Sequence, residues 1–144
     1  NYIPWDVKHH VDVIKKELDW QGSEVEGIPP EWDFEKIECY MQGARDYLKY
    51  LKRGFGRTTH LASIDIRNDR MSRETGENLV AEYDGKRPAA MDFLLEVLDI
   101  TEENLHSMIE DHVVPPHDLP DCETCRANKT NRIPEDFVNF PRIF

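Results

Sequence analysis

Five cationic side chains lie close together in a chain that is otherwise strongly acidic. Residues 44–60 contain a single acid, Asp46, and five cations: Arg45, Lys49, Lys52, Arg53 and Arg57. The whole chain has a formal net charge of −11, so this concentration of positive charge is typical of an anion-binding site. The groups that we expect to bind phosphate are Lys52, Arg53 and Arg57, with Thr58, Thr59 and His60 as hydrogen-bonding neighbours and Arg67 and Arg73 as more distant cations.

Two predicted helices would position these cations. An apolar stripe at spacings of three and four predicts one helix over residues 34–53, which Gly54 would end. Thr58 or Thr59 would cap the next helix, whose first backbone N–H groups would then point at the same pocket as Arg57. A second interpretation is that these cations only stabilise the end of the first helix, because the helix dipole alone favours cations at a C-terminus by about 0.3–1 kcal/mol each.

Capping residues and hydrophobic periodicity predict further helices near Asp6, Ser72, Pro88 and Thr101. The first of these helices carries an apolar face that we expect to be buried: Val7, Val11, Ile14 and Leu18. No segment of any length alternates as a strand does. The predicted fold class is therefore all-α, an irregular bundle of about six short helices with an extended C-terminal tail.

The composition predicts three parts and excludes some classes of function. Residues 1–5 resemble a linker from a missing N-terminal domain, residues 6–112 a helical domain, and residues 113–144 a proline-rich extended tail. The lack of an initiator methionine indicates a piece of a longer protein. A pI near 4.9 argues against nucleic acid, and no apolar run is long enough for a membrane span. The three cysteines fit a reducing cytoplasm.

A metal site is one interpretation of the tail. Cys122 and Cys125 form a Cys-x-x-Cys pair, and His112 and His117 precede them in a proline-stiffened segment. Four such ligands could hold one structural zinc ion, although the histidine spacing is not that of a standard zinc finger. Free surface thiols and a redox pair remain alternatives. Neither a Gly-x-Ser-x-Gly nor a His-Glu-x-x-His motif is present, so no catalytic residue is assigned.

Three stretches carry a family resemblance: YIPWD, IECYMQGARDYLKYLKRGFGRTTHLASIDIRNDRMSRE and LVAEYDGKRP. Together they resemble the C-terminal region of N-acetyl sugar amidotransferases, which are PP-loop ATP-pyrophosphatase relatives of lipopolysaccharide and nonulosonic-acid biosynthesis. The resemblance extends over residues 2–114, is most specific over residues 42–73, and does not include the cysteine-containing tail.

This resemblance implies a reaction for the full-length protein. ATP with Mg²⁺ would activate the amide oxygen of an N-acetyl group on a nucleotide sugar, and ammonia from a glutaminase subunit would convert acetamido to acetamidino. The PP-loop belongs to an N-terminal domain, so the present chain alone is not expected to turn over ATP. Its cations would bind phosphate of ATP, pyrophosphate or the nucleotide sugar. The alternative is a non-catalytic helical module that docks a glutaminase or mediates oligomerisation.

Overall fold

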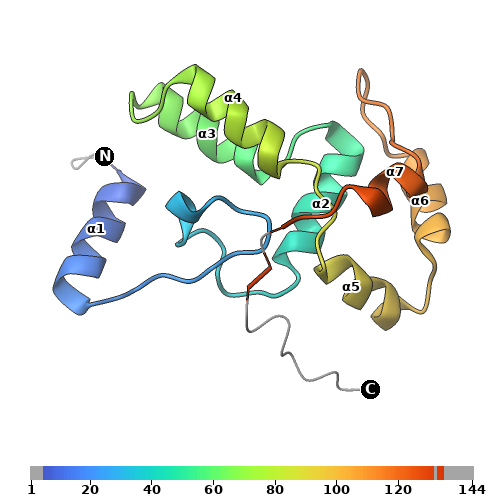
Figure 1. Ribbon diagram of the computed structural model, residues 1–144, viewed down its shortest axis with the longest axis horizontal. Helices are drawn as coiled ribbons and strands as arrows, with labels where there is room; N and C mark the ends of the chain where they lie inside the picture. The colour runs from blue at the N-terminus through green and yellow to red at the C-terminus, as the bar shows by residue number, and fades with distance from the viewer. Residues whose placement is uncertain (1–4, 132, 135–144) are drawn as a thin grey trace.

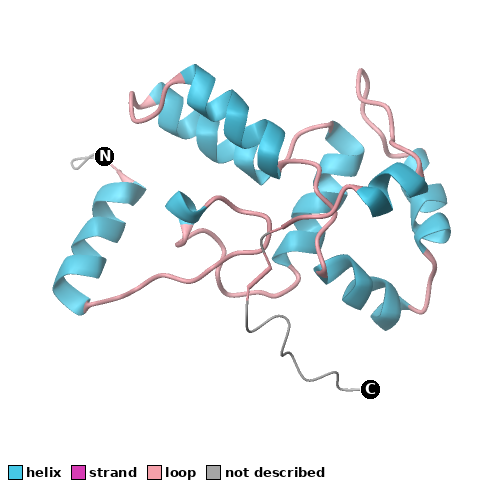
Figure 2. Ribbon diagram, in the orientation of Figure 1, coloured by secondary structure: helices cyan, strands magenta, loops and turns pink. Residues whose placement is uncertain are grey.

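The computed structural model describes residues 5–131, 133 and 134, and this part of the chain is all-α (Figure 1, Figure 2). Its helices are α1 (Val7–Leu18), α2 (Gln42–Arg53), α3 (Arg57–Arg67), α4 (Arg73–Tyr83), α5 (Ala90–Leu98), α6 (Glu102–Glu110) and α7 (Cys122–Ala127), with a 3-10 turn, η1 (Pro30–Trp32). The all-α prediction is confirmed. None of the described helices is long and apolar enough to cross a membrane.

Helix α2 lies at the centre of the molecule and packs against α5 and α6 (Figure 1). Helices α3 and α4 lie side by side as a hairpin. Gly76 lies at their contact, where a Cβ atom would be 2.9 Å from Cδ1 of Ile66. Helix α7 packs on α6, whereas α1 stands apart at the end of a long loop.

Two clusters of buried side chains form the hydrophobic interior. The central cluster joins α2, α5, α6 and α7 and is built from Ala44, Tyr47, Leu51, Ala90, Met91, Leu105, Ile109 and Cys125. The loop cluster packs the segment before α2 against α3 and contains Val25, Ile28, Trp32, Leu61 and Ala62. Helix α1 contributes no residue to either cluster.

The predicted helix over residues 34–53 is wrong in its first half. Helix α2 begins at Gln42, and the preceding residues form turns, with Lys36 at a left-handed φ of 59°. Tertiary packing explains the difference, since Phe34 packs on the loop cluster while Met41 and Ala44 join the central cluster. Because of this bend, the apolar residues that form one stripe in the sequence pack into two separate clusters.

The segment predicted to be an extended tail contains a helix. Helix α7 begins after its N-cap Asp121, and the buried Cys125 of this helix belongs to the central cluster. The apolar contact of Cys125 makes this part of the tail a packed element, which the proline-rich composition did not indicate. Residues 132 and 135–144 of the predicted tail and residues 1–4 of the predicted linker lie outside the described residues.

Candidate functional site

The corner between α2 and α3 is where the sequence concentrates its cations. Gly54 ends α2 as predicted, with φ of 74° and its N–H donated to the carbonyl oxygen of Tyr50 at 2.8 Å. Helix α3 begins at Arg57, and Gly56 is its N-cap. The prediction that Thr58 or Thr59 caps this helix is therefore wrong, because both residues already lie within its first turn.

The carboxylate that caps α3 comes from Asp84, at the end of α4. Its oxygens accept the N–H groups of Gly56 at 2.9 Å, Thr58 at 3.0 Å and Thr59 at 3.1 Å, and also the Thr59 hydroxyl at 2.6 Å. A Cβ atom at position 56 would lie 2.4 Å from an oxygen of Asp84, so glycine leaves the room that the carboxylate uses. The predicted anion position at this helix end thus holds an anion of the chain itself.

Arg57 is paired with acids rather than open to solvent. Its Nε and Nη2 atoms donate to the two carboxylate oxygens of Asp46 at 3.1 and 3.0 Å, and Nη1 lies 3.6 Å from Glu35. The Arg57 side chain is only 18% exposed. A bidentate pair of this kind fixes the guanidinium group and balances its charge. Arg57, the first of the predicted phosphate ligands, is therefore engaged within the fold.

The other predicted residues of the corner differ in accessibility. Thr58 is fully buried, and its hydroxyl has no hydrogen-bond partner among the described residues. Lys52 is half-buried, whereas Arg53 and His60 are exposed. Neither Lys52 nor Arg53 forms an ion pair with a carboxylate in the described part of the chain.

A small cavity lined in part by charged side chains lies behind the corner. It has a volume of about 30 Å³ and is lined by Asp46, Tyr47, Arg57, Asp84 and Lys86 among others. Burial raises the pKa of the Tyr47 hydroxyl, and the neighbouring Cys125 thiol acts in the same direction. Because about 10–15 Å³ of such space is needed for one water molecule, this cavity has room for water but not for a nucleotide.

An open groove with a volume of about 540 Å³ lies along α3 and α4. Its lining is mostly apolar and includes Ala62, Ile66, Val80 and Ala81. Three of the residues singled out from the sequence line it: Thr59, Arg67 and Arg73. Arg73 donates to Glu77 at 2.8 Å, and Arg67 forms no ion pair with any described carboxylate.

The structure therefore divides the predicted phosphate site in two. Arg67 and Arg73 meet at the groove, while Lys52 and Arg53 lie at the end of α2 and Arg57 turns inward. The groove offers two guanidinium groups beside an apolar surface. Such a surface suits a ligand that has both a phosphate and a less polar body.

The four predicted zinc ligands do not form a cluster. All four lie in the described part of the chain, where no group of three or more His, Cys, Asp or Glu side chains is placed to hold a metal ion. His112 is exposed, and the His117 ring packs against Tyr50, with ring centroids 5.7 Å apart. Burial raises the pKa of both Cys122 and Cys125, which disfavours the thiolate form that binds zinc. The zinc prediction gains no support from this geometry.

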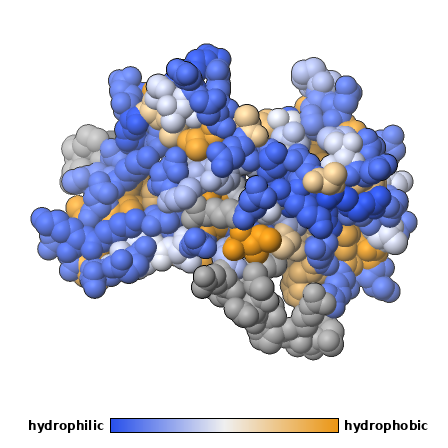
Figure 3. All heavy atoms as spheres, in the orientation of Figure 1, coloured by the Kyte–Doolittle hydropathy of each residue, from blue (hydrophilic) through white to orange (hydrophobic). Residues whose placement is uncertain are grey.

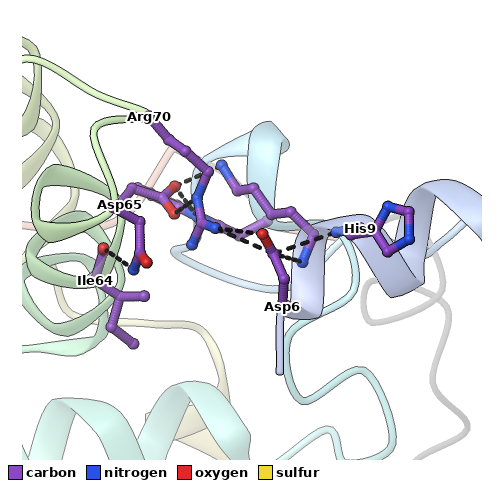
Figure 4. Close-up of polar contacts among 8 residues, drawn as sticks. Asp6, His9, Ile64, Asp65 and Arg70 are labelled. Atoms are coloured by element: carbon purple, nitrogen blue, oxygen red, sulfur yellow. Dashed lines mark hydrogen bonds and ion pairs between the residues drawn. The ribbon is translucent and has the colours of Figure 1, made fainter. Parts of the chain in front are cut away.

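Sequence reasoning missed the capping roles of Asp84 and Glu26, and it gave Asp65 only as a candidate for a structural ion pair, without its partners. Asp84 caps α3, and the buried Glu26 accepts the N–H groups of Ala89 and Ala90 at the start of α5, at 2.6 and 3.2 Å. Asp65 is buried between Lys8, Arg70 and Trp32 (Figure 4). A local sequence pattern does not predict these contacts, because each carboxylate and most of its partners are far apart in sequence.

Comparison with known proteins gives one result. The chain matches the family described as LPS biosynthesis protein WbpG-like, C-terminal domain, over residues 31–129. Comparisons with curated proteins and with solved structures gave no match. The matched residues run from η1 to the residue after Asn128, and they include all of α2 to α7 and both predicted cation groups. With more than half of its residues matched, the chain belongs to the WbpG-like C-terminal domain family of lipopolysaccharide biosynthesis proteins.

Proposed function

We propose that this chain is the C-terminal helical domain of an ATP-dependent N-acetyl sugar amidotransferase, and that its α3–α4 groove binds the diphosphate of the nucleotide-sugar substrate. Membership of a lipopolysaccharide biosynthesis family supports the sugar-nucleotide class of substrate. The observation that carries the proposal is the groove itself, because Arg67 and Arg73 line it together with a mostly apolar surface.

The chemistry of the groove matches such a ligand. Guanidinium groups bind phosphate oxygens through charge-assisted hydrogen bonds. The unpaired Arg67 is free to make these bonds, and Arg73 could exchange Glu77 for a phosphate oxygen at little cost, since an exposed ion pair is worth only about 0–1 kcal/mol. Ile66 and Val80 would contact the less polar faces of the sugar or base.

This domain would bind and orient the substrate rather than perform the chemical step. In the proposed reaction, the oxygen of the N-acetyl group would bond to the α-phosphate of ATP, bound with Mg²⁺, and release pyrophosphate. Ammonia from a glutaminase subunit would then add to the activated carbon, lose a proton and expel that oxygen as part of AMP. The nucleotide would be held by an N-terminal PP-loop domain. The groove residues would hold the diphosphate so that the acetamido group reaches that domain.

A second candidate function is a non-catalytic module that docks a glutaminase or a second subunit. Two observations favour it: Asp84 already neutralises the start of α3, and Arg57 is already paired with Asp46. Under this alternative, Arg67 and Arg73 are surface cations without a ligand.

A binding titration separates the two candidates. We expect pyrophosphate and a UDP-N-acetyl sugar to shift the amide NMR signals of Thr59, Arg67 and Arg73. Replacing both Arg67 and Arg73 with alanine should weaken binding by about tenfold to a hundredfold, the usual effect of losing a hydrogen bond to a charged group.

Arg126→Ala is the matched control, because Arg126 is an exposed arginine paired with Glu103 on another face of the molecule. This variant should bind as tightly as the unchanged chain. Signal changes confined to Lys52, Arg53 and His60 would move the site to the α2–α3 corner. The absence of any shift at millimolar ligand would favour the docking module.

A further inference from the structure

Helix α1 carries an apolar stripe that the described structure leaves open. Val7, Val11, Ile14 and Leu18 follow one another at spacings of four, three and four, which is the seam spacing of helices that pack on helices. Yet Leu18 is 73% exposed and Ile14 is 40% exposed, and α1 has no buried residue. Figure 3 shows hydrophobic atoms among hydrophilic ones at the end of the molecule where α1 lies. The burial expected from the sequence is therefore not met by the described residues.

Polar contacts on a different side of the helix hold α1 in place. Lys8 pairs with Asp65, Lys15 pairs with Asp33 at 2.7 Å, and the N-cap Asp6 pairs with Arg70 at 3.1 Å (Figure 4). Lys8 also lies 5.7 Å from the centre of a Trp32 ring. At about 100° per residue, Lys8 and Lys15 project some 70–90° around the helix from the centre of the stripe. These ion pairs therefore hold α1 against the rest of the domain, with its apolar stripe directed away from that contact.

The position of α1 in the chain points to what covers the stripe. The family match begins at residue 31 and describes a C-terminal domain, so α1 lies on the N-terminal side of that domain. We propose that the stripe of α1 packs against a helix of the domain that precedes this one in the longer polypeptide. Helix α1 would then contact both domains. Its lysines would face the C-terminal helical domain, and its aliphatic side chains would face the preceding domain. This proposal depends on family membership and not on the proposed activity.

The size of the stripe favours a partner within the same polypeptide over a second copy of the chain. Stable complexes between separate molecules usually engage about 20–30 residues on each side, whereas the stripe offers four side chains. A covalently linked domain is present at an effective concentration of roughly millimolar, so a small apolar contact is enough.

Hydrogen exchange followed by mass spectrometry tests the proposal directly. The α1 amides of the full-length polypeptide should exchange about tenfold more slowly than those of the 144-residue chain, because docking adds to their protection. Ile14→Asp should remove this difference. Val13→Asp is the matched control, since Val13 is 44% exposed on the same helix and projects about 100° away from Ile14; it should leave the difference intact.

Three outcomes would overturn the proposal. Equal exchange of α1 in the two proteins would show that the stripe is not covered by the preceding domain. An encoded polypeptide with no domain upstream of α1 would remove the proposed partner. Light scattering that shows a dimer of the 144-residue chain, dissociated by Ile14→Asp and not by Val13→Asp, would assign the stripe to a second copy. None of these results depends on ligand binding at the α3–α4 groove, so the two proposals fail separately.

Discussion

At the scale of single residues, carboxylates determine which cations and helix ends remain available. Asp84 occupies the start of α3, and Asp46 with Glu35 surrounds Arg57. In a chain of net charge −11, a cation placed near the interior is readily paired with an acid of the same chain. Local density of positive charge therefore predicts where cations are but not whether they are free. Arg67 remains available because it projects from the exposed end of α3.

Asp84→Ala tests the role of this carboxylate as a cap. The variant should lose about 1–2 kcal/mol of unfolding free energy, because the first N–H groups of α3 lose their acceptor. Inorganic phosphate should then raise the melting temperature of the variant more than that of the unchanged chain, since an anion can occupy the vacated position. Thermal unfolding followed by circular dichroism measures both effects.

Asp118→Ala, at an exposed aspartate outside this contact, is the control and should change neither quantity. A phosphate effect of equal size in the unchanged chain and in Asp84→Ala would show that the α3 end does not bind anions even when Asp84 is absent.

At the scale of elements, carboxylates and hydroxyls cap the starts of helices in two different ways. The ends at Asp6, Ser72 and Thr101 are capped by their own side chains, as the sequence predicted, and Thr101 forms a full capping box with Asn104. The starts of α3 and α5 are capped instead by Asp84 and Glu26 from other elements. Helices capped in this second way depend on tertiary packing for their stability.

The attachment of α1 should depend on pH through Asp65. Burial alone would raise the pKa of Asp65, but hydrogen bonds and charges from Lys8 and Arg70 outweigh it, and the pKa lies below the ordinary value of 3.8. A lowered carboxyl pKa contributes stability that is present above pH 3.8 and is lost as the pH falls through the folded-state pKa. We expect α1 to detach in that acidic range, with a change in the fluorescence of the buried Trp32, which donates to Asp65 at 3.1 Å.

At neutral pH, Asp65→Asn should already show the Trp32 fluorescence that is expected when α1 is detached. The fluorescence change on acidification that is due to Asp65 should then be absent. Asp33→Asn provides a comparison, because it removes only the contact of Lys15 and leaves Lys8 and Arg70 in place. An acid transition of unchanged size in Asp65→Asn would assign the pH dependence to other carboxylates.

At the scale of the whole molecule, α1 and the remaining helices are held by different forces. The two hydrophobic clusters include residues of the loop before α2 and of α2 to α7, while α1 is attached by ion pairs. The matched family region likewise excludes α1. The part of the chain that folds around its own interior is therefore the part that follows α1.

A chain that lacks residues 1–18 should keep its fold. We expect one cooperative thermal transition, with a melting temperature about 2–8 °C lower. Partly exposed ion pairs contribute about 0–1 kcal/mol each, and the buried Asp65 keeps Arg70 and Trp32 as partners when Lys8 is removed. Circular dichroism should show the loss of helix from α1 only. A broad, non-cooperative transition would mean that α1 is part of the folding unit.

The sequence alone determined the all-α class, the cap residues of α1, α4 and α6, and the end of α2 at Gly54, because each of these depends on residues within about four positions of one another. The tertiary structure decided the bend before α2, the helix within the tail and the pairing of Arg57. It also decided that Asp84 caps α3 from 28 residues beyond Gly56, and that Glu26 caps α5 across 63 residues. Contacts over such separations form only when packing brings the elements together, so no local pattern of residue types could specify them.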